Sequence, residues 1–501
     1  MLLEGAPVDL TRASIVSIRD SIRAKKISAV EVTKHFLERT ERLDKKLNSF
    51  VTMNPKALDE AKAVDSAIAQ GKDPGILAGV PIAVKDLLCT EGLRTTACSN
   101  ILKNFIPPYS ATVVNRLQSA GAVVLGKTNL DEFAMGSSNE TSAFGVVHNP
   151  WNVDYVPGGS SGGSAAALAA HLAPGAIGTD TGGSIRQPAS FCGVYGIKPT
   201  YGRVSRYGII AYASSLDQAG PMAHSTADCA LMLESFAGRC KYDSTSAHVE
   251  VPSWSRNLSD DLKGIRIGLP KEYFSEKLDA DVTRVTQEAI EALKKRGAEM
   301  VEVSLPLVKH AVPIYYLIAT SEASSNLARY DGVRFGHRAD FSKTQAKDLV
   351  EFYSMSRGEG FGPEVKRRIM LGTYALSSGY YDAYYNKAGQ VRRLLRDEFL
   401  HAFESCDVLL SPVTTSPAFK IGSRITDPLE MYLNDIFTTS TNLAGLPGMS
   451  VPAGFSADGL PIGVQLTAKH FDEQSIFNVS LALENTLQLN AKNPERVPHV
   501  I

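Results

Sequence analysis

The chain has 501 residues, of which 44% are hydrophobic and 21% are charged; this is ordinary globular usage and excludes a wholly disordered chain. Its 52 Lys and Arg residues nearly balance its 53 Asp and Glu residues, so the net charge of -1 excludes a global basic surface for holding RNA or an anionic membrane.

The first predicted elements are two helices, because apolar residues recur at helical spacing between residues 9 and 47 with a break at "AKKIS". Thr11 or Ser14 is the expected cap of the first helix. Further on, "GILAGVPIAVKDLL" is an apolar run bounded by Gly and Pro, which predicts a buried strand that delivers Lys85 at its end. The segment "SATVVNRLQSAGAVVLGKTNL" predicts a helix followed by a second buried strand.

The middle of the chain is unusual because two glycine–serine loops, within residues 157–199, bracket an Ala-rich helix and the short apolar run "GAIGTD". Residues 241–262 are polar and irregular, which predicts a surface excursion. After them we expect a strand at "GIRIGLP", a charged helix from about Asp279 to Arg296, and strands at "CDVLLSPV" and "GLPGMSVPAGF". This order predicts an α/β fold with a mixed, mostly buried sheet.

The sequence carries no sign of export or of a metal site. The N-terminus lacks the basic start and apolar run of a signal peptide, and no stretch reaches the ~20 apolar residues of a membrane span. The six cysteines form no Cys-x-x-Cys pair, so neither a disulfide framework nor a zinc site is predicted. We expect a soluble, reduced, cytoplasmic protein.

The glycine–serine loops run into helix-forming residues, so their backbone N–H groups lie near helix N-termini and favour negative charge. No Lys follows the glycines, which argues against a phosphate-binding loop. In the second loop Ser184 follows two glycines, and the N–H groups of Thr181, Gly182 and Gly183 surround it as in an oxyanion hole.

A serine nucleophile needs a base. His148 and His171 are the nearest histidines in the sequence, but neither lies in a stretch typical of a catalytic triad. Ser161 fits the Gly-x-Ser-x-Gly nucleophile elbow, although no strand immediately precedes it. Lys85 remains, with two interpretations. Either its side chain snorkels to the surface or is ion-paired, with Asp86 as one candidate partner, or burial lowers its pKa by the ~3 units that a neutral amine at pH 7 requires.

The motifs "PIAVKD", "GGSSGGSAA" and "GTDTGGSIRQPASFCG" together closely resemble those of the amidase-signature hydrolases. That resemblance implies a single α/β/α domain over residues 1–501 with a central mixed sheet, in which residues of about 60–235 carry the triad and 263–501 complete the sheet and pocket. It also implies that Lys85 is the general base, Ser160 a bridging serine beside a cis peptide, and Ser184 the nucleophile.

Within that family, "KPTYGRVSRYGIIAYASSLDQAGP" and "NLAGLPGMSVPAGF" are similar to the glutamine-hydrolysing subunits of tRNA-dependent amidotransferases. The resemblance implies that Arg368 binds the carboxylate of glutamine, that Asp435 binds its ammonium group, and that Met135 and Ser137 line the pocket. The alternative is that Arg367, Arg368 and Asp435 are ordinary surface charges on helices.

Partners and cofactors are also implied only by this resemblance. Ammonia would pass to a B subunit, which uses ATP and Mg²⁺ to activate misacylated Glu-tRNA or Asp-tRNA, while a small C subunit clasps the chain. No cofactor or metal is expected in the chain itself, and no membrane. Two alternatives stay open: a free-standing hydrolase of small amides, and an inactive scaffold.

Overall fold

The structure is a computed structural model that describes residues 9–275, 278–342, 346–424, 431–432, 434–489 and 498–500. The helices are α1 (Ile15–Arg23), α2 (Ala29–Leu43), α3 (Ala57–Ala69), α4 (Thr112–Ser119), α5 (Gly162–Ala169), α6 (Arg186–Cys192), α7 (Thr226–Phe236), α8 (Lys271–Ser275), α9 (Ala280–Lys295), α10 (Ala311–Leu327), α11 (Leu349–Gly360), α12 (Pro363–Ala375), α13 (Lys387–Ala402), α15 (Thr439–Leu443) and α16 (Glu473–Leu487). The strands are β1 (Phe50–Met53), β2 (Pro81–Lys85), β3 (Val123–Thr128), β4 (Gly175–Asp180), β5 (Tyr195–Lys198), β6 (Gln218–Ala223), β7 (Arg266–Pro270), β8 (Glu299–Val303), β9 (Val408–Pro412), β10 (Gly448–Phe455) and β11 (Pro461–Ala468).

The described strands form one 11-stranded sheet in the order β1-β3-β2-β4-β6-β5-β10-β11-β9-β7-β8. The sheet is mixed: β3, β2 and β4 are parallel neighbours, as are β9, β7 and β8, and the pairs between these two groups are antiparallel. Strands β2, β3, β4 and β6 are buried along their whole length, as expected where helices cover both faces.

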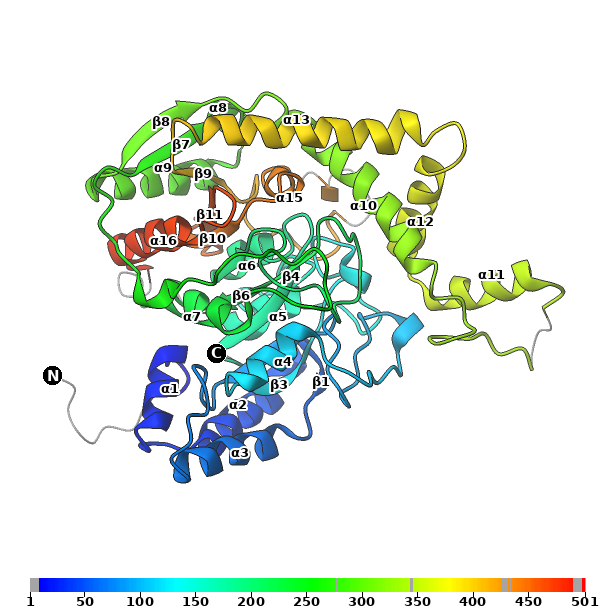
Figure 1. The fold of residues 1–501 in the computed structure, drawn as a ribbon, viewed down its shortest axis with the longest axis horizontal. Coiled ribbons are helices and arrows are strands. Elements are labelled where there is room, and N and C mark those ends of the chain that lie inside the picture. Colours follow the sequence, from blue (N-terminus) through cyan, green and yellow to red (C-terminus); the bar gives the residue numbers. More distant parts are fainter. Residues whose placement is uncertain are drawn as a thin grey trace.

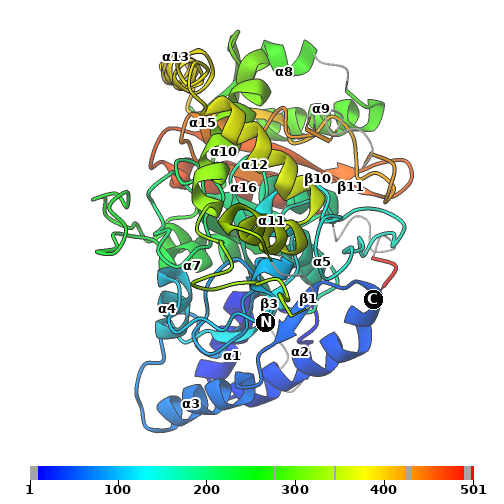
Figure 2. The ribbon, with the colours of Figure 1, turned by 90° about the vertical axis from the view of Figure 1, so that its right-hand side faces the viewer.

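Helices cover both faces of the sheet, as two glycines of β4 show. A side chain at Gly178 would meet Ser161 and Ile185, next to α5 and α6, whereas one at Gly175 would meet Ile15 of α1 and Met232 of α7. Figure 1 shows α1, α2 and α3 at one end of the molecule, α13 along the opposite end, and α11 extending away from the body. Both views place α10 beside α12 (Figure 2). The predicted α/β fold with a mixed, buried sheet is confirmed.

The early helices and strands lie where the sequence predicts them. The break at "AKKIS" separates α1 from α2, and Ser14 rather than Thr11 caps α1, because its hydroxyl accepts from the N–H of Ser17. Ser28 and Glu31 form a capping box at α2. Lys85 is the last residue of β2, as predicted.

The irregular segment 241–262 contains a short helical turn at Trp254–Arg256, and Trp254 is completely buried against Phe477 of α16. The expected surface excursion is therefore anchored to the core by one large aromatic side chain. Among the described residues, no helix combines the length and the apolar character that crossing a membrane would require.

Candidate active site

Lys85 ends β2 inside the protein, with no exposed surface. Its Nζ lies within hydrogen-bond distance of three hydroxyl oxygens: Ser160 Oγ at 2.8 Å, Ser161 Oγ at 2.9 Å and Thr179 Oγ1 at 2.9 Å. Strand β4 supplies Thr179, and the first glycine–serine loop supplies the two serines. The amine is therefore surrounded by neutral hydroxyl groups.

Burial lowers the pKa of Lys85 to about 7, although the more distant carboxylates of Asp131 and Asp180 oppose this shift. The alternative ion pair with Asp86 is wrong, because the Asp86 carboxylate lies 3.9 Å from Lys127 Nζ. Asp86 lies in the turn that follows β2, and its carboxylate accepts hydrogen bonds from the N–H and the hydroxyl of Thr96. A large fraction of Lys85 is thus neutral at neutral pH, as a general base requires.

Ser160 is fully buried and follows a cis peptide bond between Gly159 and Ser160. The N–H of Ser161 donates to the carbonyl of Ser184 at 3.1 Å, which brings the two glycine–serine loops together. Sequence reasoning missed that Ser161 also contacts Lys85. The Ser161 hydroxyl is buried and donates to the Thr179 carbonyl at 3.1 Å, so it is not the exposed nucleophile of an elbow.

Ser184 lies two residues before α6 and keeps 9% of its surface exposed. Within the described part of the chain its hydroxyl has no hydrogen-bond partner, and no bond joins it to the Ser160 hydroxyl. Catalytic hydrogen bonds often form only when substrate is bound. The serine that is accessible here is thus the one at the helix start, beside the buried Lys85–Ser160 pair.

The predicted oxyanion loop needs one correction. The N–H of Gly183 donates to Asp180 Oδ1 at 2.9 Å, because the Asp180 carboxylate turns back and also binds the N–H of Ile185. Gly183 is therefore not a free donor. The N–H groups of Thr181 and Gly182 have no acceptor among the described residues, and the Thr181 hydroxyl is fixed by Asp217 at 2.7 Å.

A buried ion pair that the sequence analysis did not identify holds this loop. Arg186 binds both carboxylate oxygens of Asp180 at 3.0 Å, and neither side chain is exposed. Burial disfavours the ionised form of Asp180, but the Arg186 guanidinium outweighs it and lowers the pKa of Asp180 to about 2. The same guanidinium also binds the side chains of Asn442 and Gln465, so it joins the loop to α15 and β11.

Arg368 lies on α12 and is 3% exposed, so its interpretation as a surface charge is wrong. That interpretation fits Arg367, whose side chain is 45% exposed. Arg368 Nε donates to Glu364 and Nη1 to the Tyr212 hydroxyl, each at 2.8 Å. Its guanidinium also lies over three aromatic rings, those of Tyr212, Tyr316 and Tyr432.

Asp435 is 6% exposed, which excludes a simple surface charge, and it accepts a hydrogen bond of 2.5 Å from the Ser137 hydroxyl. Burial raises its pKa to about 7, and the bond from Ser137 opposes that shift. Asp435 Oδ1 would lie 3.3 Å from a side-chain carbon at Gly183, so the carboxylate borders the oxyanion loop.

Two of the four predicted pocket residues meet in one small hollow. Ser137 and Arg368 both line a space of about 40 Å³. Asp435 adjoins it through Ser137, whereas Met135 is buried and is not part of its lining. Arg368, which is paired with Glu364, therefore supplies a cation at this hollow, while the Asp435 carboxylate lies between Ser137 and the loop at Gly183; a cation and a carboxylate are the groups that a zwitterionic ligand needs.

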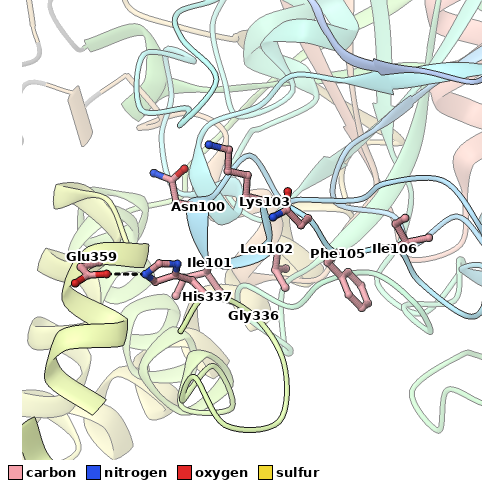
Figure 3. A pocket seen from close by; sticks show the side chains of 10 residues that line it. Asn100, Ile101, Leu102, Lys103, Phe105, Ile106, Gly336, His337 and Glu359 are labelled. Carbon is pink, nitrogen blue, oxygen red and sulfur yellow. Dashed lines mark hydrogen bonds and ion pairs between the residues drawn. The ribbon is translucent and has the colours of Figure 1, made fainter. Parts of the chain in front are cut away.

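A larger hollow of about 480 Å³ lies elsewhere, between the segment Asn100–Ile106 and the ion pair of His337 and Glu359 (Figure 3). None of the residues predicted for the site lines it. No group of three or more His, Cys, Asp or Glu side chains in the described residues is placed to hold a metal ion.

Known proteins resemble the chain over nearly its whole length. The model of the Amidase family matches residues 31–477. The A subunit of a glutamyl-tRNA(Gln) amidotransferase from Bdellovibrio bacteriovorus is 63% identical over 494 residues, which cover 99% of this chain and all of that protein. The crystal structure of a protein of the same name from Thermotoga maritima superposes with a TM-score of 0.78 at 39% identity and covers 96% of each chain. A peptide amidase from Stenotrophomonas maltophilia is 30% identical, with a TM-score of 0.82 over 99% of this chain and all of that one.

Proposed function

The chain belongs to the amidase family, and from the contact between Lys85 and Ser160 we propose that it hydrolyses an amide bond through an acyl-enzyme on Ser184. The observation that carries this proposal is a buried amine with a pKa of about 7 that lies 2.8 Å from a serine hydroxyl, in the loop that contacts Ser184. A lysine in this state accepts a proton at neutral pH, which an ordinary exposed lysine does not.

In the proposed reaction Lys85 accepts the proton of Ser160 while Ser160 accepts that of Ser184. Ser184 Oγ then attacks the amide carbon, and the N–H groups of Thr181 and Gly182 stabilise the negative oxygen. The nitrogen leaves as ammonia after the proton returns through Ser160, and a water molecule hydrolyses the ester by the same route. The hydrogen bond from the Ser161 N–H to the Ser184 carbonyl links the two loops that carry Ser160 and Ser184.

The substrate of this proposal is free glutamine, whose side-chain amide is the bond broken. Glutamine also carries a carboxylate and an ammonium group, which need a cation and an anion in the pocket. Arg368 supplies the cation and Asp435 the anion, with Ser137 holding the Asp435 carboxylate in place.

We propose that the ammonia serves a tRNA-dependent amidotransferase. The relatives that resemble the chain over nearly its full length are named as A subunits of glutamyl-tRNA(Gln) amidotransferases. Partners of the B and C kind, the ATP and Mg²⁺ used by the B subunit, and misacylated tRNA as the final acceptor belong to this proposal. So do the cytoplasmic location and the organisation of residues 1–501 as one domain.

A free-standing amidase is the second candidate, supported by the 30% identity with the peptide amidase. It is not favoured, because the identity to the amidotransferase subunits is much higher and the Arg368–Asp435 pocket suits a zwitterion better than a peptide. An inactive scaffold is not favoured either, since Lys85 retains the contacts and the lowered pKa of a base.

The test measures ammonia and glutamate released from glutamine by the chain co-expressed with B and C subunits. We expect wild-type protein to release both, and Ser184→Ala to release neither while assembling normally. Mass spectrometry after treatment with a glutamine-like electrophile should find the adduct on Ser184. Hydrolysis of unrelated amides with no activity on glutamine would favour the free-standing amidase instead.

A further inference from the structure

One hydrogen bond ties the oxyanion loop to a segment that is remote in the sequence. Thr438 is completely buried, and its hydroxyl donates to the carbonyl of Gly182 at 2.6 Å. The same hydroxyl lies 3.2 Å from the carbonyl of Asp435, and the N–H of Thr438 donates to that carbonyl too. Thr438 therefore belongs to the turn that presents Asp435 and leads into α15.

This bond fixes one end of a single peptide unit whose other end is also fixed. The unit between Gly182 and Gly183 offers its carbonyl to Thr438 and its N–H to Asp180, at 2.9 Å. Bonds at both ends prevent the peptide plane from rotating. The preceding unit carries the N–H of Gly182, one of the two proposed oxyanion donors, which has no acceptor among the described residues, so the held unit restricts the direction of that N–H.

Close packing reinforces the contact. A side-chain carbon on Gly183 would lie 2.3 Å from Thr438 Oγ1 and 3.3 Å from Asp435 Oδ1, so the glycine backbone rests against the turn. Gly183 also has a φ of 143°, which L side chains rarely adopt. Arg186 Nη1 donates to the Thr438 carbonyl at 3.2 Å, so a second hydrogen bond, to the backbone, also holds the turn in place.

We infer that Thr438 is a positioning residue that couples the ammonium site at Asp435 to the oxyanion loop at Gly182. The inference rests on the proposed function and deepens it. An ammonium group that binds the Asp435 carboxylate adds a contact to the turn that includes Thr438. The hydrogen bond from the Thr438 hydroxyl to the Gly182 carbonyl then restrains the position of Gly182. The correct amide substrate thereby aligns the Gly182 N–H, which stabilises the substrate's reacting oxygen.

The coupling explains how a glutaminase would favour glutamine over amides that lack an ammonium group. Small displacements of a catalytic group cost up to about a hundredfold in rate. A ligand without the ammonium group adds no contact at Asp435 to the bonds that already hold the turn, so the loop is held less firmly although every catalytic residue is present. The preference for glutamine over amides without an ammonium group then appears in kcat as well as in KM.

The test uses the complex with B and C subunits and compares glutamine with glutaramic acid, which is glutamine without its ammonium group. Thr438→Val keeps the shape of the side chain and removes the hydroxyl. We expect kcat for glutamine to fall about tenfold to a hundredfold, KM to change by less than about threefold, and the preference for glutamine over glutaramic acid in kcat to shrink. Thr438→Ser should recover most of the loss.

Thr439→Val is the matched control. Thr439 is the next residue and equally buried, but its hydroxyl has no hydrogen-bond partner among the described residues, so its removal should leave kcat unchanged. Thr438→Ala replaces the valine variant if that one does not assemble.

Wild-type kcat in a folded Thr438→Val or Thr438→Ala complex would overturn the inference and leave the proposed function intact. An equal loss in Thr438→Ser or Thr439→Val would also overturn it. A wild-type complex that releases no ammonia from glutamine would overturn the proposed function, and the inference with it.

Discussion

Lys85 and Lys127 lie on neighbouring parallel strands, one residue apart in register, and both are fully buried. Lys127 is paired with Val84, so the two amines point to opposite faces of the sheet. Lys127 contacts carbonyl and hydroxyl oxygens and lies 3.9 Å from Asp86, while Lys85 contacts the hydroxyls of the glycine–serine loops. Burial lowers both pKa values, that of Lys127 to about 8, but only Lys85 lies on the face that carries the serines.

Turnover should depend on pH through the titration of Lys85. The reactive form of Lys85 is the neutral amine, so kcat for glutamine should rise with pH through about 7 and level off above it. At one pH unit below that pKa the neutral fraction, and with it kcat, should be about tenfold below the plateau. Lys85→Arg stays protonated and should be inactive throughout. A kcat that is flat from pH 6 to pH 8 would exclude Lys85 as the base.

Lys85 should also make the stability of the protein depend on pH. Its pKa of about 7 in the folded state lies below the ordinary 10.5, so the unfolded chain binds more protons between these values and folding becomes more favourable as pH rises. The gain is about 1.4 kcal/mol per pH unit.

Lys85→Met lacks this proton. Lys127 and Lys198, the buried last residue of β5 whose pKa burial also lowers to about 7, are present in both proteins, so their titration cancels in the comparison. The Tm of wild type relative to that of Lys85→Met should therefore increase between pH 7.5 and pH 9. If the curves of Tm against pH for wild type and for Lys85→Met are parallel, the Lys85 amine stays protonated in the folded protein.

The two serines next to Lys85 should differ in function although both contact its amine. Ser160→Ala removes the proposed proton relay and should lower kcat by about a thousandfold. Ser161→Ala removes a hydroxyl that donates to the Thr179 carbonyl, and we expect a loss of about tenfold, since the relay remains. Single-turnover release of ammonia measures both. A larger loss in Ser161→Ala would move the relay to Ser161.

The sequence predicts the core of the fold and the residues of the triad because their signals are local. An apolar run in the sequence predicts a buried strand. The position of Lys85 at the end of β2 therefore follows from "PIAVKD". Ser160 and Ser184 stand in short glycine-rich motifs. Such motifs identify positions but not partners: the contact of Ser161 with Lys85 and the capture of the Gly183 N–H by Asp180 depend on how the loop folds back.

Contacts between remote segments have no local signal at all. Nothing near Arg186 indicates that its guanidinium reaches Gln465, and nothing near Thr438 indicates Gly182. The positions of Arg368 and Asp435 were suggested by resemblance alone, since a single charge on a helix is usually exposed. Their burial becomes visible only when α12 and the turn before α15 pack against the loops.

Arg368 should govern binding of glutamine. Arg368→Ala removes a buried, charged hydrogen-bond donor, which is worth about 2–3 kcal/mol, so KM should rise about 30-fold to 150-fold. Arg367→Ala is the matched control, because its side chain is one residue away and 45% exposed; we expect its KM within twofold of wild type. Steady-state kinetics on purified complexes distinguish the two. Equal effects of both substitutions would argue against a carboxylate site at Arg368.

Asp435 should make KM itself depend on pH. Its pKa of about 7 means that part of the carboxyl is protonated at neutral pH, and only the ionised form attracts an ammonium group. KM for glutamine should therefore fall as pH rises through 7, by about tenfold between one unit below the pKa and the plateau. Glutaramic acid has no ammonium group, so its KM should lack this dependence.

Two variants test the assignment to Asp435. Asp435→Asn should have a raised KM that is independent of pH between 6 and 8. Ser137→Ala removes the hydroxyl that stabilises the carboxylate at 2.5 Å, so the pKa of Asp435 should rise further and the fall in KM should move to higher pH. The measurement is KM across pH for each protein with both ligands. If the KM profile of Ser137→Ala coincides with that of wild type, the hydroxyl does not support the ammonium site; if Asp435→Asn keeps the wild-type profile, another group titrates.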